Sequence, residues 1–228
     1  MERMQAMKDR DFSRVTPAIE TLANEARVNG GIDPALYDTY SVKRGLRDLQ
    51  GNGVLTGLTE ISEVHAKEKA PDGTMVPCHG KLFYRGYNVE DLINGFIADN
   101  RFGFEETTYL LLFGALPSQK ELSSFRRILG TYRCIPPNFV RDIIMKKPSR
   151  DIMNAMARSV LMLYTYDTRA DDISLPNVLR QCLQLISEFP LLAVYNYQAY
   201  HHYHMGGSLI IHEPDPTLST AECILHLL

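Results

Sequence analysis

From Asn88 onward, apolar residues recur at intervals of three and four, and this spacing constrains the fold more than any other feature of the chain. The clearest stripe consists of Val89, Leu92, Ile93, Phe96 and Ile97. Side chains three or four positions apart share one face of an α-helix, so the stripe predicts a helix with its apolar side against a core. Further helices are expected at 17–29, 104–113, 136–145, 150–164 and from 175 through the histidines to Gly206.

Capping residues and glycines mark where several of these helices begin and end. Gly114 follows the apolar run 104–113 and is typical of a helix C-terminus. Ser118 and Glu121 have the spacing of a capping box that begins a helix. Ser174 is expected to cap the last long helix, in which Pro190 either produces a kink or begins a second helix.

A short β element is expected before these helices. Two β-prone runs flank the turn Pro71-Asp72-Gly73, which predicts a hairpin near residues 58–87. Pro77 has no N–H to donate, so the second arm is expected at a sheet edge. No repeat, low-complexity block or long linker separates domains. The predicted fold class is therefore mainly α, in one multi-helical domain with a small β hairpin.

Composition and charge exclude several classes of protein. The 228 residues are 45% apolar and 22% charged, and their net charge is -3, which favours neither nucleic acid nor an anionic membrane as a partner. The N-terminus has no apolar segment typical of a secretory signal, and no apolar run approaches the ~20 residues that span a bilayer. The 4 cysteines are dispersed without a CxxC spacing, so we expect a reducing, cytoplasmic compartment.

The run HHYHMGGSLIIH, at 201–212, is the densest group of possible acid–base or metal-binding residues. His201 and His204 would share a helical face and could both ligate a metal. A third ligand is not evident, and we interpret these histidines as polar residues of the last turn before Gly206. We predict no metal site, and no nucleophilic triad has a sequence signature.

The basic, glycine-rich segment KRGLRDLQGNG, at 43–53, is a second candidate site. Glycines allow backbone amides to approach a phosphate, and Lys43, Arg44 and Arg47 supply positive charge. The segment has neither the P-loop nor the Rossmann pattern. On the residues alone, an exposed basic loop is the favoured interpretation, with a phosphate cradle as the alternative.

Six segments taken together resemble the N-terminal part of a citrate synthase. They are VKRGLRDLQGNGVLTGLTEI (42–61), GKLFYRGYNVEDL (80–92), FEETTYLLLFGALPSQKEL (104–122), KPSRDIMNAMARSVLMLYTYD (147–167), ISLPNVLRQCLQLISEFP (173–190) and LSTAECILHLL (218–228). They occur in the order found in the family and extend over most of the chain.

The resemblance implies a mainly helical protein that condenses acetyl-CoA with oxaloacetate to give citrate and CoA. Residues 1–228 would be a partial large helical domain, with the small catalytic domain and the rest of the large domain absent. The family is dimeric, has no tightly bound cofactor, and uses acetyl-CoA as substrate and CoA as product. The full-length protein would thus have acetyl-CoA, oxaloacetate and a second copy of itself as partners.

The resemblance also implies which site residues are present. Arg47 lies at the position where the family places an arginine near the CoA phosphates, and Arg44 is a neighbouring candidate. The catalytic aspartate and histidines of the family follow the segment similar to 218–228, so they are expected beyond Leu228. We therefore expect a truncated chain that is inactive alone.

Two alternatives remain open at this point. One is a fragment of a 2-methylcitrate synthase, a sibling enzyme that uses propionyl-CoA. The other is a non-catalytic helical module whose role is self-association.

Overall fold

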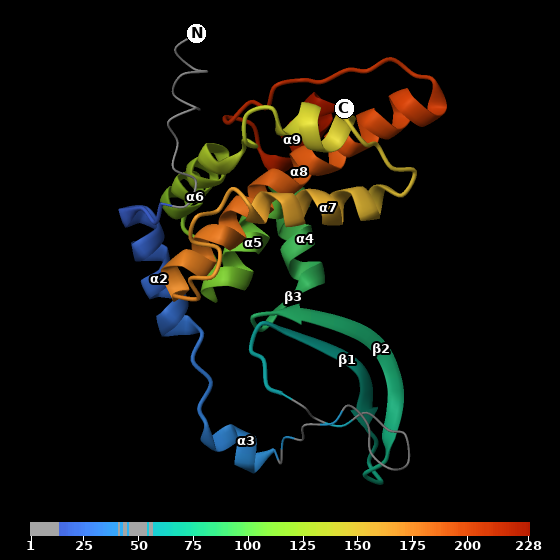
Figure 1. The fold of residues 1–228 in the computed structure, drawn as a ribbon. Helices are drawn as coiled ribbons and strands as arrows, with labels where there is room; N and C mark the ends of the chain where they lie inside the picture. The colour runs from blue at the N-terminus through green and yellow to red at the C-terminus, as the bar shows by residue number, and fades with distance from the viewer. Residues whose placement is uncertain (1–13, 41, 43–44, 46–53, 55–56) are drawn as a thin grey trace. The chain divides into compact units, whose positions relative to one another are not determined.

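Helices predominate in the computed structural model, which describes residues 14–40, 42, 45, 54 and 57–228. The elements are α2 (Pro17–Asn29), α3 (Ala35–Thr39), β1 (Ser62–Lys69), β2 (Met75–Tyr84), β3 (Tyr87–Asn88), α4 (Val89–Ala98), α5 (Phe104–Phe113), α6 (Gln119–Tyr132), η1 (Val140–Met145), α7 (Ile152–Tyr164), α8 (Leu175–Met205) and α9 (Thr220–Leu227). The predicted fold class, mainly α with a small β hairpin, is confirmed (Figure 1).

The chain forms two compact units. Of the described residues, unit 1 contains 14–23 and Ser118–Leu228, and unit 2 contains those within Asn24–Pro117. Unit 2 is therefore continuous in sequence, whereas unit 1 is assembled from two separate stretches.

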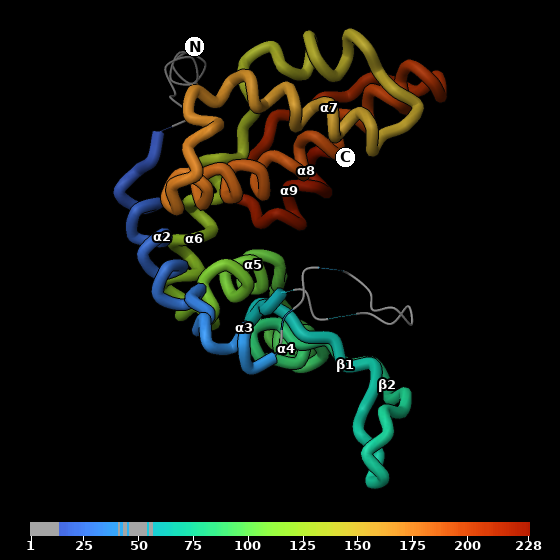
Figure 2. The backbone as a smooth tube through the Cα atoms, turned by 60° about the horizontal axis from the view of Figure 1, so that its bottom comes forward, coloured from blue at the N-terminus to red at the C-terminus, as the bar shows by residue number. Residues whose placement is uncertain are grey.

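The predicted hairpin is the main β element of unit 2. Strands β1 and β2 are antiparallel, from Ser62 opposite Tyr84 to Lys69 opposite Met75, and Figure 2 shows their turn extending away from α4. The short β3 pairs only with Phe83 and Tyr84, so β2 is central at that end alone. None of the described strands pairs with the other side of β2 at Pro77, which agrees with the missing N–H of proline.

The helix boundaries in unit 2 follow the sequence signals. The side chain of Asn88 accepts a hydrogen bond of 3.1 Å from the N–H of Glu90 and so caps α4. Helix α5 ends at Gly114, whose φ of 81° is the left-handed conformation that glycine adopts without strain. The predicted start of α4 and end of α5 are confirmed.

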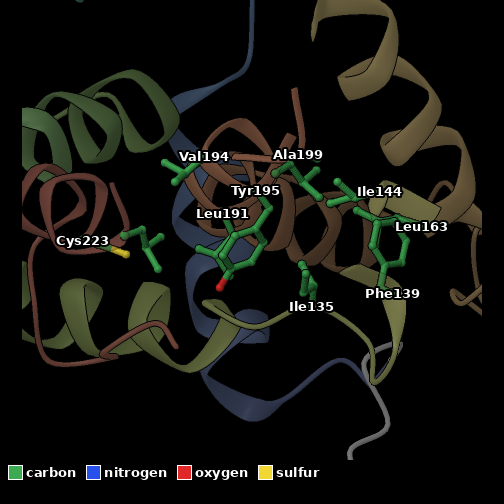
Figure 3. Packing of buried hydrophobic residues seen from close by; sticks show 11 residues of the cluster. Ile135, Phe139, Ile144, Leu163, Leu191, Val194, Tyr195, Ala199 and Cys223 are labelled. Atoms are coloured by element: carbon green, nitrogen blue, oxygen red, sulfur yellow. The ribbon is translucent and has the colours of Figure 1, made fainter. Parts of the chain in front are cut away.

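The core of unit 1 is built around α8, which contacts α6, η1, α7 and α9. Figure 3 shows side chains from several of these elements converging on the same interior region. The buried cluster consists of Ile135, Phe139, Ile144, Leu163, Leu191, Leu192, Val194, Tyr195, Ala199, Cys223 and Leu227. Burial of this set provides the main hydrophobic stabilisation of unit 1.

Two capping boxes fix helix starts in unit 1, and the predicted one is confirmed. The N–H of Ser118 donates to the Glu121 carboxylate at 2.7 Å, and the Ser118 hydroxyl accepts from the N–H of Glu121 at 3.4 Å. The second box, between Ser219 and Glu222, starts α9.

The capping role predicted for the side chain of Ser174 is wrong. Ser174 is the residue before α8, but its side chain makes no capping hydrogen bond. Pro176 occupies the second helical position, where it has no N–H to offer a cap. The N–H of Ser174 instead donates to Asp172 at 2.9 Å.

Two segments of unit 1 differ from regular α-helix. The run expected as a short helix contains a π-helix, Val140–Met145, after Asn138, whose φ is 65°. Pro190 lies inside α8 and does not begin a second helix, since α8 is continuous from Leu175 to Met205. Its neighbours Leu191 and Leu192 are fully buried, and this packing offsets the backbone hydrogen bond that proline removes.

None of the helices within the described part of the chain combines the length and the apolar character needed to span a membrane.

Candidate functional site

The arginines predicted to approach the CoA phosphates lie outside the described residues. Arg44 and Arg47, like Lys43, belong to the stretch whose placement is not described. Their assignment to a phosphate site stays a prediction from the sequence.

The histidine run closes α8. His202 and His204 lie in the last turn, and Gly206 ends the helix with a φ of 74°. Nδ1 of His202 lies 2.8 Å from the carbonyl oxygen of Gly207. The His201 ring stacks on Tyr197 with 6.0 Å between ring centroids. The interpretation of these histidines as residues of the terminal turn is confirmed.

His212 and His226 come together although 13 residues separate them. Their ring centroids are 5.8 Å apart, and Nε2 of His226 lies 3.1 Å from the carbonyl oxygen of Glu213. Within the described residues, no group of three or more His, Cys, Asp or Glu side chains is arranged to hold a metal. The contacts of His226 therefore connect α9 to the 207–218 segment.

A buried polar cluster along α8 is a candidate feature that sequence reasoning missed. Arg180 is fully buried, and its guanidinium donates to three acceptors. These are Asn177 at 3.0 Å, Gln184 at 2.9 Å and Asp167 at 2.5 Å. The four residues Asn177, Arg180, Gln184 and Glu188 follow helical spacing, so a polar stripe on one face of α8 was the signal that could have located them.

Glu188 is the unusual member of this cluster. Its exposed fraction is 0%, Oε1 accepts a 3.0 Å hydrogen bond from Gln184, and Oε2 has no hydrogen-bond partner. Burial raises the pKa of this carboxyl to about 8, while the hydrogen bond from Gln184 and the charge of Arg180 act in the opposite direction. Glu188 is therefore largely protonated at neutral pH.

A cavity of about 170 Å³ adjoins this carboxyl. It is lined by Val160, Leu163, Tyr164, Asp167, Ala170, Gln181, Gln184, Leu185 and Glu188. The residues come from α7, α8 and the loop between them, all within unit 1. A cavity with apolar walls and a few polar groups can bind a small molecule, and a carboxyl of raised pKa in such a place is a candidate functional group.

A match to a protein-family profile over most of the chain decides which family the chain belongs to. Residues 48–228 match the profile of the citrate synthase C-terminal domain. The chain belongs to the citrate synthase family.

Individual citrate synthase relatives agree with this assignment. The chain is 29% identical over 192 residues to the citrate synthase of Haloferax volcanii, covering 82% of this chain and 43% of that protein. It is 31% identical over 126 residues to 2-methylcitrate synthase 1 of Corynebacterium glutamicum, covering 55% of this chain and 27% of the relative.

The fold is also that of citrate synthases. The structure of the Thermoplasma acidophilum citrate synthase, a ternary complex with carboxymethyl coenzyme A and oxaloacetate, superposes with a TM-score of 0.59. The two sequences are 22% identical, and the match covers 81% of this chain and 41% of that one. The chain thus spans less than half the length of each of these citrate synthase family proteins.

Proposed function

We propose that this chain is part of the large helical domain of an acyltransferase that condenses acetyl-CoA with oxaloacetate to give citrate and CoA. The observation that carries this proposal is the family match over residues 48–228. The related structure that holds a CoA derivative together with oxaloacetate supports the choice of substrates.

Arg47 is the residue proposed to contact CoA, with Arg44 beside it. A guanidinium binds phosphate through paired, charge-assisted hydrogen bonds, so the contact would contribute affinity for the nucleotide part of CoA. The family match begins at residue 48, directly after Arg47, and so does not itself include this position.

The condensation needs a base to remove a methyl proton from acetyl-CoA and donors to stabilise the enol and polarise the ketone. Among the described residues, the cavity next to Glu188 contains no histidine. We propose that the 228 residues bind part of the CoA and that groups outside them complete the catalytic constellation. Residues 1–228 would correspond to a partial large domain, and the small catalytic domain would supply the remaining groups.

A binding titration and an activity assay test this proposal. The chain should bind CoA more tightly than dephospho-CoA, and Arg47→Ala should weaken CoA binding several-fold because one phosphate contact is lost. Arg14→Ala, which removes an exposed arginine outside the 43–53 segment, is the matched control and should change little. CoA release from acetyl-CoA and oxaloacetate should be undetectable, and measurable turnover would contradict the proposed incompleteness.

A 2-methylcitrate synthase is the second candidate, favoured by the Corynebacterium glutamicum relative. This enzyme would take propionyl-CoA in place of acetyl-CoA. The ratio of kcat/KM for the two thioesters, measured in a polypeptide that joins this chain to a complete small domain, separates the candidates. A ratio in favour of propionyl-CoA would replace the first proposal.

The proposed assembly is a homodimer in the cytoplasm. Several large apolar side chains of unit 1 are exposed, including Met153, Leu161 and Leu225, at 75%, 72% and 72%. Exposed apolar side chains of this size favour association. No two of the four cysteines, all of which lie in the described part of the chain, are joined in a disulfide, which suits a reducing compartment. A stable dimer that does not bind CoA would instead support the non-catalytic self-association module.

A further inference from the structure

The cavity between α7 and α8 contains a carboxyl oxygen that the described protein groups do not use, and this oxygen is an acceptor once Glu188 has ionised. Glu188 lines this cavity, and its Oε2 is enclosed without a hydrogen-bond partner. A buried polar atom that lacks a partner costs free energy, and such atoms in native proteins are usually satisfied by a solvent molecule or a ligand. Above its pKa, the ionised Glu188 would receive the missing hydrogen bond from a donor group placed in the cavity.

The cavity suits a small molecule with one polar end. Val160, Leu163 and Leu185 provide apolar wall, whereas Glu188 and Asp167 provide carboxyl groups. A volume of about 170 Å³ has room for about five groups of the size of water, each of which occupies ~30 Å³ in the liquid. A short alkyl chain with one terminal donor fits this combination of size and lining.

The surroundings of the cavity select a cation. A larger open pocket of about 480 Å³ adjoins the cavity, since both are lined by Tyr164, Asp167 and Ala170. This outer pocket is formed by residues 164–172, which include three aspartates and one arginine. The charge of Arg180 is already paired with Asp167. Arg169 is likewise paired with Asp172, so the approach to Glu188 carries one carboxylate more than guanidinium groups, and this excess favours a positively charged ligand.

We propose that this cavity binds a small alkylammonium ion, with its N–H groups donating to Glu188 and its alkyl chain against Val160, Leu163 and Leu185. A charge-assisted hydrogen bond would satisfy Oε2, and the alkyl chain would cover the apolar wall. This site is separate from the condensation of acetyl-CoA with oxaloacetate, and nothing in the proposed function requires it.

Titration with n-butylammonium, followed by NMR of the 228-residue chain at pH 9, tests the site. n-Butanol is the neutral control ligand, because it has the same alkyl chain and a donor without charge. Butanol should bind at least tenfold more weakly. Equal affinity for the two probes would overturn the proposal.

Matched variants locate the binding. Glu188→Gln should weaken butylammonium binding at least tenfold, whereas the same change at the exposed Glu213 should leave it unchanged. Val160→Phe fills the cavity while it keeps the carboxyl, and it should also abolish binding. This second variant keeps the test valid if Glu188→Gln does not fold. Butylammonium binding that survives Val160→Phe would place the ligand elsewhere.

The affinity should also depend on pH in a defined direction. The ammonium ion binds the ionised carboxyl, whose pKa is about 8. A butylammonium ion remains protonated at pH 9, as a lysine side chain does with its pKa of about 10.4. Affinity should therefore be about tenfold weaker at pH 7 than at pH 9. Arg180 on α8, Tyr164 on α7 and Asp167 in the loop face the same region, so the profile must disappear in Glu188→Gln to be assigned to this carboxyl.

A lysine side chain carries the same chemistry as a free amine. Nα-acetyl-lysine-N-methylamide presents the ammonium group on a blocked peptide unit. It therefore distinguishes a lysine of a peptide from a free amine as the occupant. If it binds as well as butylammonium, a lysine of a peptide segment is a suitable occupant. If only butylammonium binds, the site takes free amines.

Discussion

Glu188 holds its proton more tightly in the folded chain than in the unfolded chain, because burial raises its pKa from 4.5 to about 8. Below pH 4.5 both states are protonated, and the contribution of this group to stability is fully present. As the pH rises, the unfolded chain ionises first, so the free energy of unfolding falls until the folded-state pKa is passed. The fall should be roughly 1.4 kcal/mol for each pH unit in this window.

Glu188→Gln should remove this pH dependence, because glutamine does not ionise. Urea unfolding of both proteins at pH 5, 7 and 9 measures the effect. The wild-type chain should lose stability relative to Glu188→Gln as the pH rises from 5 to 9. Parallel stability curves for the two proteins would show that this carboxyl does not carry the effect.

Arg180 is the other residue of the cluster whose removal should be costly. Its side chain is 0% exposed and pairs with Asp167. Arg180→Met keeps most of the side-chain volume but leaves Asp167 without its buried cation, and this should cost about 3–5 kcal/mol. The exposed Arg169, which pairs with Asp172, is the control, and Arg169→Met should cost no more than about 1 kcal/mol. Urea unfolding measures the free energy of unfolding of both variants. Equal losses would contradict the expectation that the buried ion pair contributes more than the exposed one.

At the scale of elements, Gly130 shows how closely α6 and the loop before α9 approach each other. A Cβ at Gly130 would lie 2.2 Å from the carbonyl oxygen of Pro216, which is backbone and cannot move aside freely. Gly95 in α4 has open space around the corresponding position.

Opposite effects are therefore expected from the same substitution in these two helices. Gly95→Ala should stabilise by up to about 1 kcal/mol, because alanine is the better helix former. Gly130→Ala should destabilise by about 1–3 kcal/mol, because overpacking outweighs that gain. Thermal unfolding of both variants measures the two effects. Stabilisation by Gly130→Ala would show that the loop moves away without cost.

The helix boundaries that were predictable from sequence are those that depend on neighbouring residues. The capping box of Ser118 and the glycine stop at Gly114 need only local hydrogen bonds and local backbone conformation, so their residue types suffice. The course of α8 through Pro190 depends on what buries the helix, and the sequence pattern alone left two possibilities. The π-helix at Val140–Met145 had no local signal.

For the candidate site too, the sequence predicted local features and missed those that depend on tertiary contacts. Arg44 and Arg47 were chosen by resemblance to a family, and their positions lie outside the described residues. The polar stripe on α8 was present in the sequence, but the contact of Arg180 with Asp167, which precedes α8, had no local pattern to predict it. The free oxygen of Glu188 becomes evident only when all its neighbours are placed.

For the whole molecule, the exposed apolar side chains of unit 1 predict self-association. Leu161 is 72% exposed on α7, so Leu161→Glu should favour the monomer without loss of the fold. Val64 is 70% exposed on β1 in unit 2, and Val64→Glu is the matched control. Sedimentation equilibrium should show a dimer for the wild type and the control. A wild-type chain that is monomeric at all concentrations would contradict the predicted association.

The discontinuity of unit 1 has a consequence for biosynthesis. Unit 2 is complete once Pro117 has left the ribosome, whereas the two stretches of unit 1 are separated by the whole of unit 2. During translation the described residues 14–23 must wait until all of Asn24–Pro117 has been made before the second stretch of unit 1 begins to emerge. Because domains generally fold as units in the order of synthesis, we expect the hairpin and α4–α5 to fold first. Unit 1, with the cavity beside Glu188, would then be the last part to form.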